Sequence, residues 1–287
     1  QASAGIAQKK ADPAEGRPGL QEHHRAGKEE KTARHCPIIL RLPRQKVLGW
    51  TAVCCLCIVC PMNFSQGRCG VIFDMDGVLV DSYRPHFESW HRSARQWGLE
   101  MTEEQFRSTF GMTSREIVVA LWGDRLPQKD VPAFDELKEH EYRRIILQDF
   151  PAMPGAKELI VSLHQAGFKL AVGSSGPPEN VKLVLECLGA VDLFEATVSG
   201  AEVKHGKPDP EVFLKAAGKL ELAPGECLVI EDAVPGVSAA LAAGMAVAAV
   251  TGTATRDQLA RANMVVDSLK ELTPAIVGEL IRSGSRR

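Results

Sequence analysis

Two aspartates separated by one residue, Asp74 and Asp76, directly follow the uncharged run of residues 70–73. Side chains at positions i and i+2 of an extended segment point the same way, so both carboxylates can face one crevice. Carboxylates this close repel each other, and the pKa of one of them rises unless a cation lies between them. Gly77 follows and allows a sharp turn. The pair predicts a site, although on its own it is also compatible with a capped loop after a buried strand.

Residues that can handle an anion or a cation also occur at the ends of three other predicted strands or in the loops that follow them. Ser174 follows residues 169–173, Lys207 precedes two prolines that stiffen the backbone, and Glu231 and Asp232 end a further run. Each has an ordinary explanation when taken alone: a strand-to-helix loop, a solvated lysine, or a helix cap, here Asp232. Together they offer carboxylates, a hydroxyl and an ammonium. Hard oxygen ligands suit Mg²⁺, which bridges to substrate phosphate, so the set predicts phosphoryl chemistry.

The elements that must position these groups follow a regular alternation. Continuous apolar runs separated by amphipathic segments indicate a parallel sheet covered on both faces. Ligands then bind beyond the carboxyl ends of the strands. We expect strands at residues 71–74, 169–173, 196–199, 228–231, 246–250 and 264–266. We expect helices at residues 155–166, 179–188, 210–220 and 234–243.

The interval between Asp81 and Pro154 breaks this alternation, because it contains no convincing strand. Apolar residues at helical spacing begin with Phe87 and Trp90, two capping-box patterns follow at residues 102–105 and 113–116, and another helix is expected over residues 132–147. The fold predicted is therefore an α/β, Rossmann-like parallel sheet core with an inserted α-helical cap that serves as a lid. We place the core at residues 62–83 and 152–287 and the cap at residues 84–151.

The ordered set "DMDG", "SS", "KPDP" and "ED" resembles the haloacid dehalogenase (HAD) superfamily of phosphotransferases. The resemblance covers about residues 70–283 and implies a HAD-like core. It implies that Asp74 is the nucleophile, which becomes an aspartyl-phosphate, and that Asp76 is the general acid/base. Asp76 also argues against carbon–halogen chemistry, because the second aspartate distinguishes the phosphotransferases from the dehalogenases.

The same resemblance implies the remaining groups of the site. Ser174, Ser175 and Lys207 would hold the transferring phosphoryl group, and the cofactor would be Mg²⁺. The resemblance leaves open which of the acidic residues 231 and 232 touches the metal directly. The implied magnesium ligands are Asp74, Asp76 through its backbone carbonyl, Glu231 and Asp232.

The helical insertion resembles the small cap of the β-phosphoglucomutase-like branch. "HFESW" is similar to that branch's His-Phe-x-x-Trp, "GMTSRE" to its specificity loop, and "KEHEY" loosely offers its cap lysine. The "SSGPPEN" loop departs from the mutase pattern by extra residues before Asn180. The substrate-binding candidates outside the core motifs are His86, Gly111, Ser114, Arg115, Lys138 and Asn180.

Several of these cap residues have a structural alternative. Arg115 in the first turn of a predicted helix would suit a second anion, or it would be solvated and reach a neighbouring carboxylate. His86 is as compatible with a buried, hydrogen-bonded imidazole as with a functional one. Trp90 and Trp97, at helical spacing, are expected in a core.

The first 61 residues differ from the rest of the 287-residue chain. They carry ten Lys/Arg and five Asp/Glu, whereas the remainder carries 24 and 31. Their apolar run at residues 47–60 is short for a membrane span, which needs about 20 residues. The first methionine is Met62, so we expect residues 1–61 to be a targeting leader or non-domain extension, with a membrane anchor as the alternative.

The amino-acid composition limits the classes of protein to which the chain can belong. Hydrophobic residues make up 45%, which allows a sizeable core, and the net charge of −2 gives no reason to expect nucleic-acid binding. The cysteine-rich "CCLCIVC" matches no zinc pattern, and Cys187 and Cys227 are expected to be buried. We expect a monomer in the cytoplasm, or in an organelle if the first 61 residues are a leader.

These observations favour a Mg²⁺-dependent phosphatase that acts on a small phosphorylated metabolite such as a sugar phosphate. A β-phosphoglucomutase, which would return the phosphoryl group to sugar, is the alternative with the same intermediate. A third possibility is a catalytically retired binding or regulatory module, against which the complete catalytic set argues.

Overall fold

The computed structural model describes residues 69–109 and 113–284. Within these residues the core is a sheet of parallel strands in the order β3-β2-β1-β4-β5-β6. The predicted parallel α/β architecture is confirmed, and each strand ends within a residue of its predicted boundary. The strands are β1 Gly70–Phe73, β2 Lys169–Gly173, β3 Ala196–Val198, β4 Cys227–Glu231, β5 Ala246–Val250 and β6 Met264–Val266.

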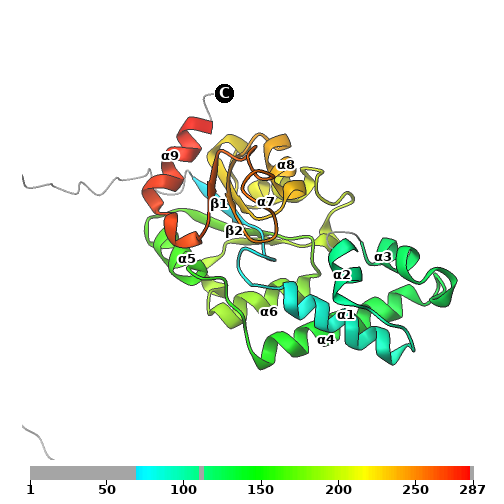
Figure 1. Cartoon of the computed structure of the whole chain (residues 1–287). Helices are drawn as coiled ribbons and strands as arrows, with labels where there is room; N and C mark the ends of the chain where they lie inside the picture. The colour runs from blue at the N-terminus through cyan, green and yellow to red at the C-terminus, as the bar shows by residue number, and fades with distance from the viewer. Residues whose placement is uncertain (1–68, 110–112, 285–287) are drawn as a thin grey trace, which may run out of the picture. The chain divides into compact units, whose positions relative to one another are not determined.

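The strands are continuous apolar runs because both faces of the sheet are covered. Val71 and Phe73 belong to one buried cluster and Ile72 to the other, as the two-residue period of a strand requires. Helices α5 (Ala156–Gln165), α6 (Pro178–Leu188) and α9 (Pro274–Gly284) supply the first face. Helices α7 (Glu211–Lys219) and α8 (Val234–Ala242) supply the second face (Figure 1).

A helical insertion separates β1 from β2, as predicted. It contains α1 (Tyr83–Gln96), α2 (Glu103–Thr109), α3 (Ser114–Leu121) and α4 (Val131–Gln148). We call these helices and their loops the cap. The predicted capping boxes form at both sites: the residue 102 amide donates to Gln105 Oε1 at 2.8 Å, and a reciprocal pair closes at residues 113 and 116.

The cap has a hydrophobic cluster of its own. The ring centroid of Phe134 lies 5.4 Å from that of Trp90 and 5.3 Å from that of Trp122, and all three side chains are buried. This cluster is distinct from the two clusters on the sheet faces. Trp90 is thus a core residue as expected, whereas Trp97 packs edge-on against Phe134 but remains 38% exposed.

The chain enters and leaves the cap along neighbouring segments. The Asp81 amide donates to the Pro151 carbonyl at 2.8 Å, and the Met153 amide donates to the Leu79 carbonyl at 3.1 Å. An isolated antiparallel bridge joins residues 80 and 152 between these bonds. The two connections therefore form a short paired ribbon at the base of the cap.

One expectation and one alternative about particular positions need correction, and one helix was not predicted. Cys187 is exposed rather than buried, although Cys227 is buried. Asp232 does not cap α8, because Ala233 occupies that position and the Asp232 carboxylate lies against Gly77. Helix α9 was not among the predicted elements.

No helix of the described part is long and apolar enough to cross a membrane. The leader and anchor hypotheses concern residues 1–61, which lie outside that part.

Candidate active site

The carboxyl ends of the central strands bring the motif residues together. Asp74 follows β1 and its amide donates to the Ile230 carbonyl of β4 at 2.9 Å. Ser174 follows β2 in the same way, with its amide on the Val198 carbonyl at 2.9 Å. Glu231 ends β4. The side chains of these residues are buried, so the sequence places polar groups inside the protein at one edge of the sheet.

Lys207 joins this group from a loop far along the chain. Its Nζ donates to Asp74 Oδ1 and to Glu231 Oε1, both at 2.7 Å, although Asp74 is 133 residues away in the sequence. Burial alone would lower the pKa of Lys207, but the charges of the two carboxylates raise it above its usual value. The lysine is therefore a permanent cation within the site.

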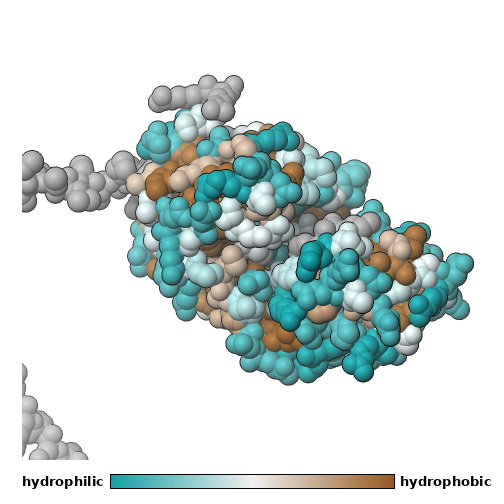
Figure 2. Space-filling view, in the orientation of Figure 1, coloured by the Kyte–Doolittle hydropathy of each residue, from teal (hydrophilic) through white to brown (hydrophobic). Residues whose placement is uncertain are grey.

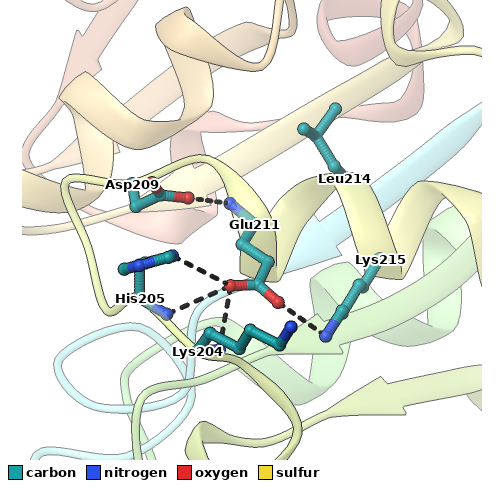
Figure 3. A pocket seen from close by; sticks show the side chains of 6 residues that line it. All are labelled: Lys204, His205, Asp209, Glu211, Leu214 and Lys215. Atoms are coloured by element: carbon teal, nitrogen blue, oxygen red, sulfur yellow. Dashed lines mark hydrogen bonds and ion pairs between the residues drawn. The ribbon is translucent and has the colours of Figure 1, made fainter.

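The loop that carries Lys207 is anchored by Glu211, the first residue of α7 (Figure 3). Glu211 Oε1 pairs with Lys215 Nζ at 2.7 Å, and Oε2 accepts from the backbone amides of Lys204 and His205 at 2.8 and 3.0 Å. The lysine and the two amides lower the Glu211 pKa to about 2. Donors already engage both oxygens of Glu211, so we interpret the surrounding pocket as a loop anchor. This role of Glu211 was not predicted from the sequence.

Three acidic side chains lie beside Lys207. One oxygen from each of Asp74, Glu231 and Asp232 lies within 4.8 Å of the others. Burial and the charges of Glu231 and Asp76 raise the pKa of Asp74 to about 7, against the opposing effect of Lys207. Burial and the two neighbouring carboxylates also raise the pKa of Asp232 well above its usual value. One ammonium does not neutralise three carboxylates, so the donor set fits a divalent cation.

The hydrogen bonds of Glu231 distinguish it from Asp232. Glu231 Oε1 accepts from Lys207, and Oε2 accepts from the backbone amides of Asp232 and Ala233, both at 2.8 Å. Both oxygens of Glu231 thus have protein donors. The Asp232 carboxylate lies against Gly77 and has a hydrogen bond with the Thr253 side chain, but it does not hold Lys207 or the backbone of the following loop.

Two glycines make room for these carboxylates. Gly77 has a φ of +74°, and a Cβ there would collide with Asp232 Oδ2. A Cβ at Gly236, in the first turn of α8, would collide with Glu231 Oε1. The side chains therefore occupy space that only a residue without a Cβ leaves open.

Asp76 faces the cap. His86 Nε2, from α1, lies 3.3 Å from Asp76 Oδ1, and the imidazole stacks on the Tyr142 ring of α4 with centroids 4.2 Å apart. Burial alone would raise the pKa of Asp76, but the hydrogen bond and charge of His86, together with Ser82 and Lys138, lower it. His86 was predicted from the sequence, but Tyr142 was not, because its only signal is its position four residues after Lys138 on one helix face.

The phosphate-loop candidates lie together. Ser174 is fully buried and its Oγ accepts from the Gly176 amide at 3.0 Å, whereas Ser175 is exposed. The Gly200 amide holds the loop through the Gly176 carbonyl at 2.9 Å. The loop therefore presents one buried hydroxyl beside the strand ends.

Two cap candidates bond to other parts of the cap. Ser114 Oγ donates to Asp135 Oδ1 at 2.6 Å. The exposed Arg115 donates to the side-chain amide of Gln128 at 2.9 Å rather than to a carboxylate. Gly111, from the same predicted loop, lies outside the described residues.

The other two candidates lie where the cap meets the core. Lys138 is buried and pairs with Glu139 at 2.6 Å. The amide of Asn180 accepts from Arg143 and donates to Glu139. These contacts favour an interaction within the protein rather than with substrate, and the substrate-binding roles of residues 111, 114, 115, 138 and 180 stay predictions.

A parallel α/β core with a paired-aspartate motif, a buried lysine and an acidic trio at the strand ends defines an enzyme class that handles phosphoryl groups. The comparison with known families agrees. The family model for haloacid dehalogenase-like hydrolases matches residues 70–244, more than half of the chain, and the chain belongs to this family. The resemblance expected from the motifs is thereby confirmed.

The names of the relatives give two kinds of activity, phosphatase and phosphoglucomutase. The chain is 35% identical over 176 residues to a phosphorylated carbohydrates phosphatase of Thermotoga maritima, covering 61% of this chain and 81% of that protein. It is 30% identical over 216 residues to the β-phosphoglucomutase of Bacillus subtilis, covering 73% and 93%. Among solved structures, a β-phosphoglucomutase from Clostridium difficile matches with a TM-score of 0.67 and 27% identity, covering 77% of this chain and all of that one.

Proposed function

We propose that this protein is a Mg²⁺-dependent phosphatase of a small phosphorylated metabolite such as a sugar phosphate. The observation that carries the proposal is the contact of Lys207 with both Asp74 and Glu231, because it assembles nucleophile, cation and acidic trio from distant parts of the chain. The phosphatase named for phosphorylated carbohydrates among the relatives supports the substrate class.

The proposed reaction has two transfers. Asp74 attacks phosphorus while the ester P–O bond breaks. Asp76, which must take up a proton before this step because its pKa is lowered, gives that proton to the leaving oxygen. Water then attacks the aspartyl-phosphate, Asp76 takes a proton from that water, and the acyl-phosphate bond breaks to release phosphate and free Asp74. Lys207 and Ser174 hold the phosphoryl oxygens during both transfers. His86 keeps Asp76 aimed at the leaving group.

We infer that Asp74 and Asp232 would contact the magnesium ion directly. Glu231 would instead hold Lys207 and the backbone of the following loop, because its oxygens already have donors. The ion supplies positive charge that lets an anionic phosphate approach an anionic nucleophile.

Mutase activity is the second candidate. The B. subtilis relative and the inserted cap favour it, because a cap that excludes water would let a sugar hydroxyl take the phosphoryl group. A retired binding module is disfavoured because Asp74 and Asp76 are both present and lie at the strand end.

A turnover assay tests the proposal. The full chain is incubated with Mg²⁺ and a panel of phosphomonoesters that includes β-glucose 1-phosphate. Phosphate release supports the phosphatase, and glucose 6-phosphate without phosphate release identifies a mutase. Asp74→Asn should abolish turnover, since an amide is a poor nucleophile, and full activity in this variant would refute the assigned mechanism.

We further propose a monomer that acts in the cytoplasm, or in an organelle if the first 61 residues address it there. The large apolar side chains exposed in the described part are few, and on the face in Figure 2 apolar residues are interspersed with polar ones, which supports a monomer. Light scattering after size exclusion and imaging of the tagged full chain check these two points.

A further inference from the structure

A buried asparagine of the core contacts two charged residues of the cap. Asn180 lies in the first turn of α6, just after the loop that carries Ser174, and is 1% exposed. Its Nδ2 donates to Glu139 Oε2 at 2.7 Å, and its Oδ1 accepts from Arg143 Nη1 at 3.1 Å. Glu139 and Arg143 are four residues apart on α4 and so share one face of that helix.

The amide suits this position better than other side chains. It presents a donor to the carboxylate and an acceptor to the guanidinium, so both charged partners are satisfied. An aspartate would keep the arginine contact but would place a second carboxylate against Glu139. An apolar residue would leave both partners without this bond, which is costly for buried groups.

Glu139 also has a partner within the cap. Its second oxygen accepts from Lys138 Nζ at 2.6 Å, and Lys138 is itself buried. Burial would raise the pKa of Glu139, but Lys138, His86 and Asn180 together lower it. The carboxylate is therefore an anion that fixes a buried ammonium. The same helix α4 carries Tyr142, which stacks on the ring of His86, and His86 Nε2 lies 3.3 Å from Oδ1 of the acid/base aspartate.

We propose that Asn180 is a positioning residue that latches the cap to the core through Glu139 and Arg143. The latch thereby holds α4 in place, so that Tyr142 stacks on the imidazole that contacts the acid/base aspartate. This rests on the proposed function. The latch forms only while α4 lies against α6, so it couples cap closure to the group that protonates the leaving oxygen. In this proposal Asn180 acts through Glu139 and Arg143 rather than by binding substrate.

Two variants of the full chain test the latch. Asn180→Asp places like charges together and should lower kcat/KM for a sugar phosphate at least tenfold. The double variant Asn180→Asp/Glu139→Gln should restore kcat/KM to within threefold of the wild-type value. The glutamine amide would then donate to the introduced carboxylate, while the glutamine oxygen would still accept from Lys138.

The choice of substrate separates positioning from a general structural effect. p-Nitrophenolate leaves without a proton, so turnover of p-nitrophenyl phosphate depends less on Asp76. Asn180→Asp should reduce that turnover less than threefold. Equal losses for the two esters, or no recovery in the double variant, would overturn the proposal. Lys182→Ala, which removes an exposed ion pair with Glu186 on the same helix, is the matched control and should leave both esters unchanged.

Hydrogen exchange gives a readout that does not need turnover. Amides of α4 and of the first turn of α6 should exchange faster in Asn180→Asp and recover in the double variant, with β1 and β4 unaffected. If the wild type hydrolyses neither ester, the proposed function fails, and exchange alone then decides whether the latch exists. Unchanged exchange in Asn180→Asp would refute it.

Discussion

At the scale of single residues, the site depends on where side chains are absent as much as on where they are present. The Glu231 carboxylate lies where a Cβ of Gly236 would be, and from there it reaches Lys207 and two backbone amides. The lysine is held between carboxylates only because this space is open.

Gly236→Ala should therefore damage the site. The added methyl group would push Glu231 Oε1 away from Lys207, and we expect kcat to fall at least tenfold and stability to fall by about 1–3 kcal/mol, as for other overpacked sites. Steady-state kinetics and urea unfolding measure both effects. Gly218→Ala in α7 is the control, because a Cβ there meets no atom within 4 Å. Equal behaviour of the two variants would contradict this account.

Glu211 gives a pH-dependent prediction. Its pKa is lowered from 4.5 to about 2 by the Lys215 ion pair and two backbone amides. A carboxylate with a lowered folded-state pKa stabilises the fold fully above its unfolded pKa and loses that contribution as pH falls through the folded value. The difference in unfolding free energy between wild type and Glu211→Gln should be constant above about pH 5.5 and should shrink below about pH 4.5. Urea unfolding from about pH 7 to about pH 3 measures it, and a pH-independent difference would disprove the assignment.

Candidate site residues that belong to recognisable sequence motifs could be predicted. Residues whose contacts depend on partners far along the chain could not. Asp74, Ser174 and Lys207 could be named because their motifs, taken together and in order, resemble those of a known family, and their catalytic roles stay predictions. Tyr142 and Arg143 could not, because nothing local indicates that α4 lies against His86 and Asn180.

At the scale of elements, the cap is a small helical unit with a core of its own. Its aromatic cluster contains Trp90, Trp122 and Phe134 and does not merge with the clusters on the sheet. The helices of the cap should therefore lose stability separately from the strands.

Phe134→Ala removes the ring at the centre of that cluster. Truncation of a buried phenylalanine typically costs about 3–5 kcal/mol, and we expect this loss to fall on the cap. Amide exchange should accelerate in α1 and α4 but not in β1 or β4. Val119→Ala, at a 55% exposed position of α3, should change stability by less than about 0.5 kcal/mol. Acceleration across the strands would show that the cap and sheet unfold as one unit.

The boundaries of the strands were predictable because both faces of the sheet are buried. Each strand is a continuous apolar run, so the residues at which it begins and ends can be predicted from the sequence. Helix α9 was missed although Val277 and Ile281 have helical spacing, because the sequence does not show that it packs on the sheet. The contacts of Ser114 and Arg115 could not be predicted from the sequence either, because their polar partners lie on other segments.

At the scale of the whole molecule, an excess of buried carboxylates over cations opposes folding. Asp74, Glu231 and Asp232 share a single ammonium from Lys207. An ion that binds the folded state alone therefore stabilises it.

Magnesium should raise the melting temperature. At a free concentration about 100 times its dissociation constant, a ligand specific for the folded state adds about 2.7 kcal/mol. Thermal unfolding with Mg²⁺, compared with NaCl at equal ionic strength, measures the effect, and chelation with EDTA should reverse it. Asp232→Asn should weaken the response. A melting temperature that Mg²⁺ leaves unchanged would argue against a metal at this site.

The paired ribbon at the base of the cap has a consequence for how such proteins diversify. Because the Asp81 amide bonds the Pro151 carbonyl and the Met153 amide bonds the Leu79 carbonyl, the two chain ends of the insert emerge side by side. The entropy of closing a loop grows only slowly with its length. Segments of very different size can therefore be grafted at this point, and specificity can change by exchange of the insert while the catalytic scaffold keeps its strand order.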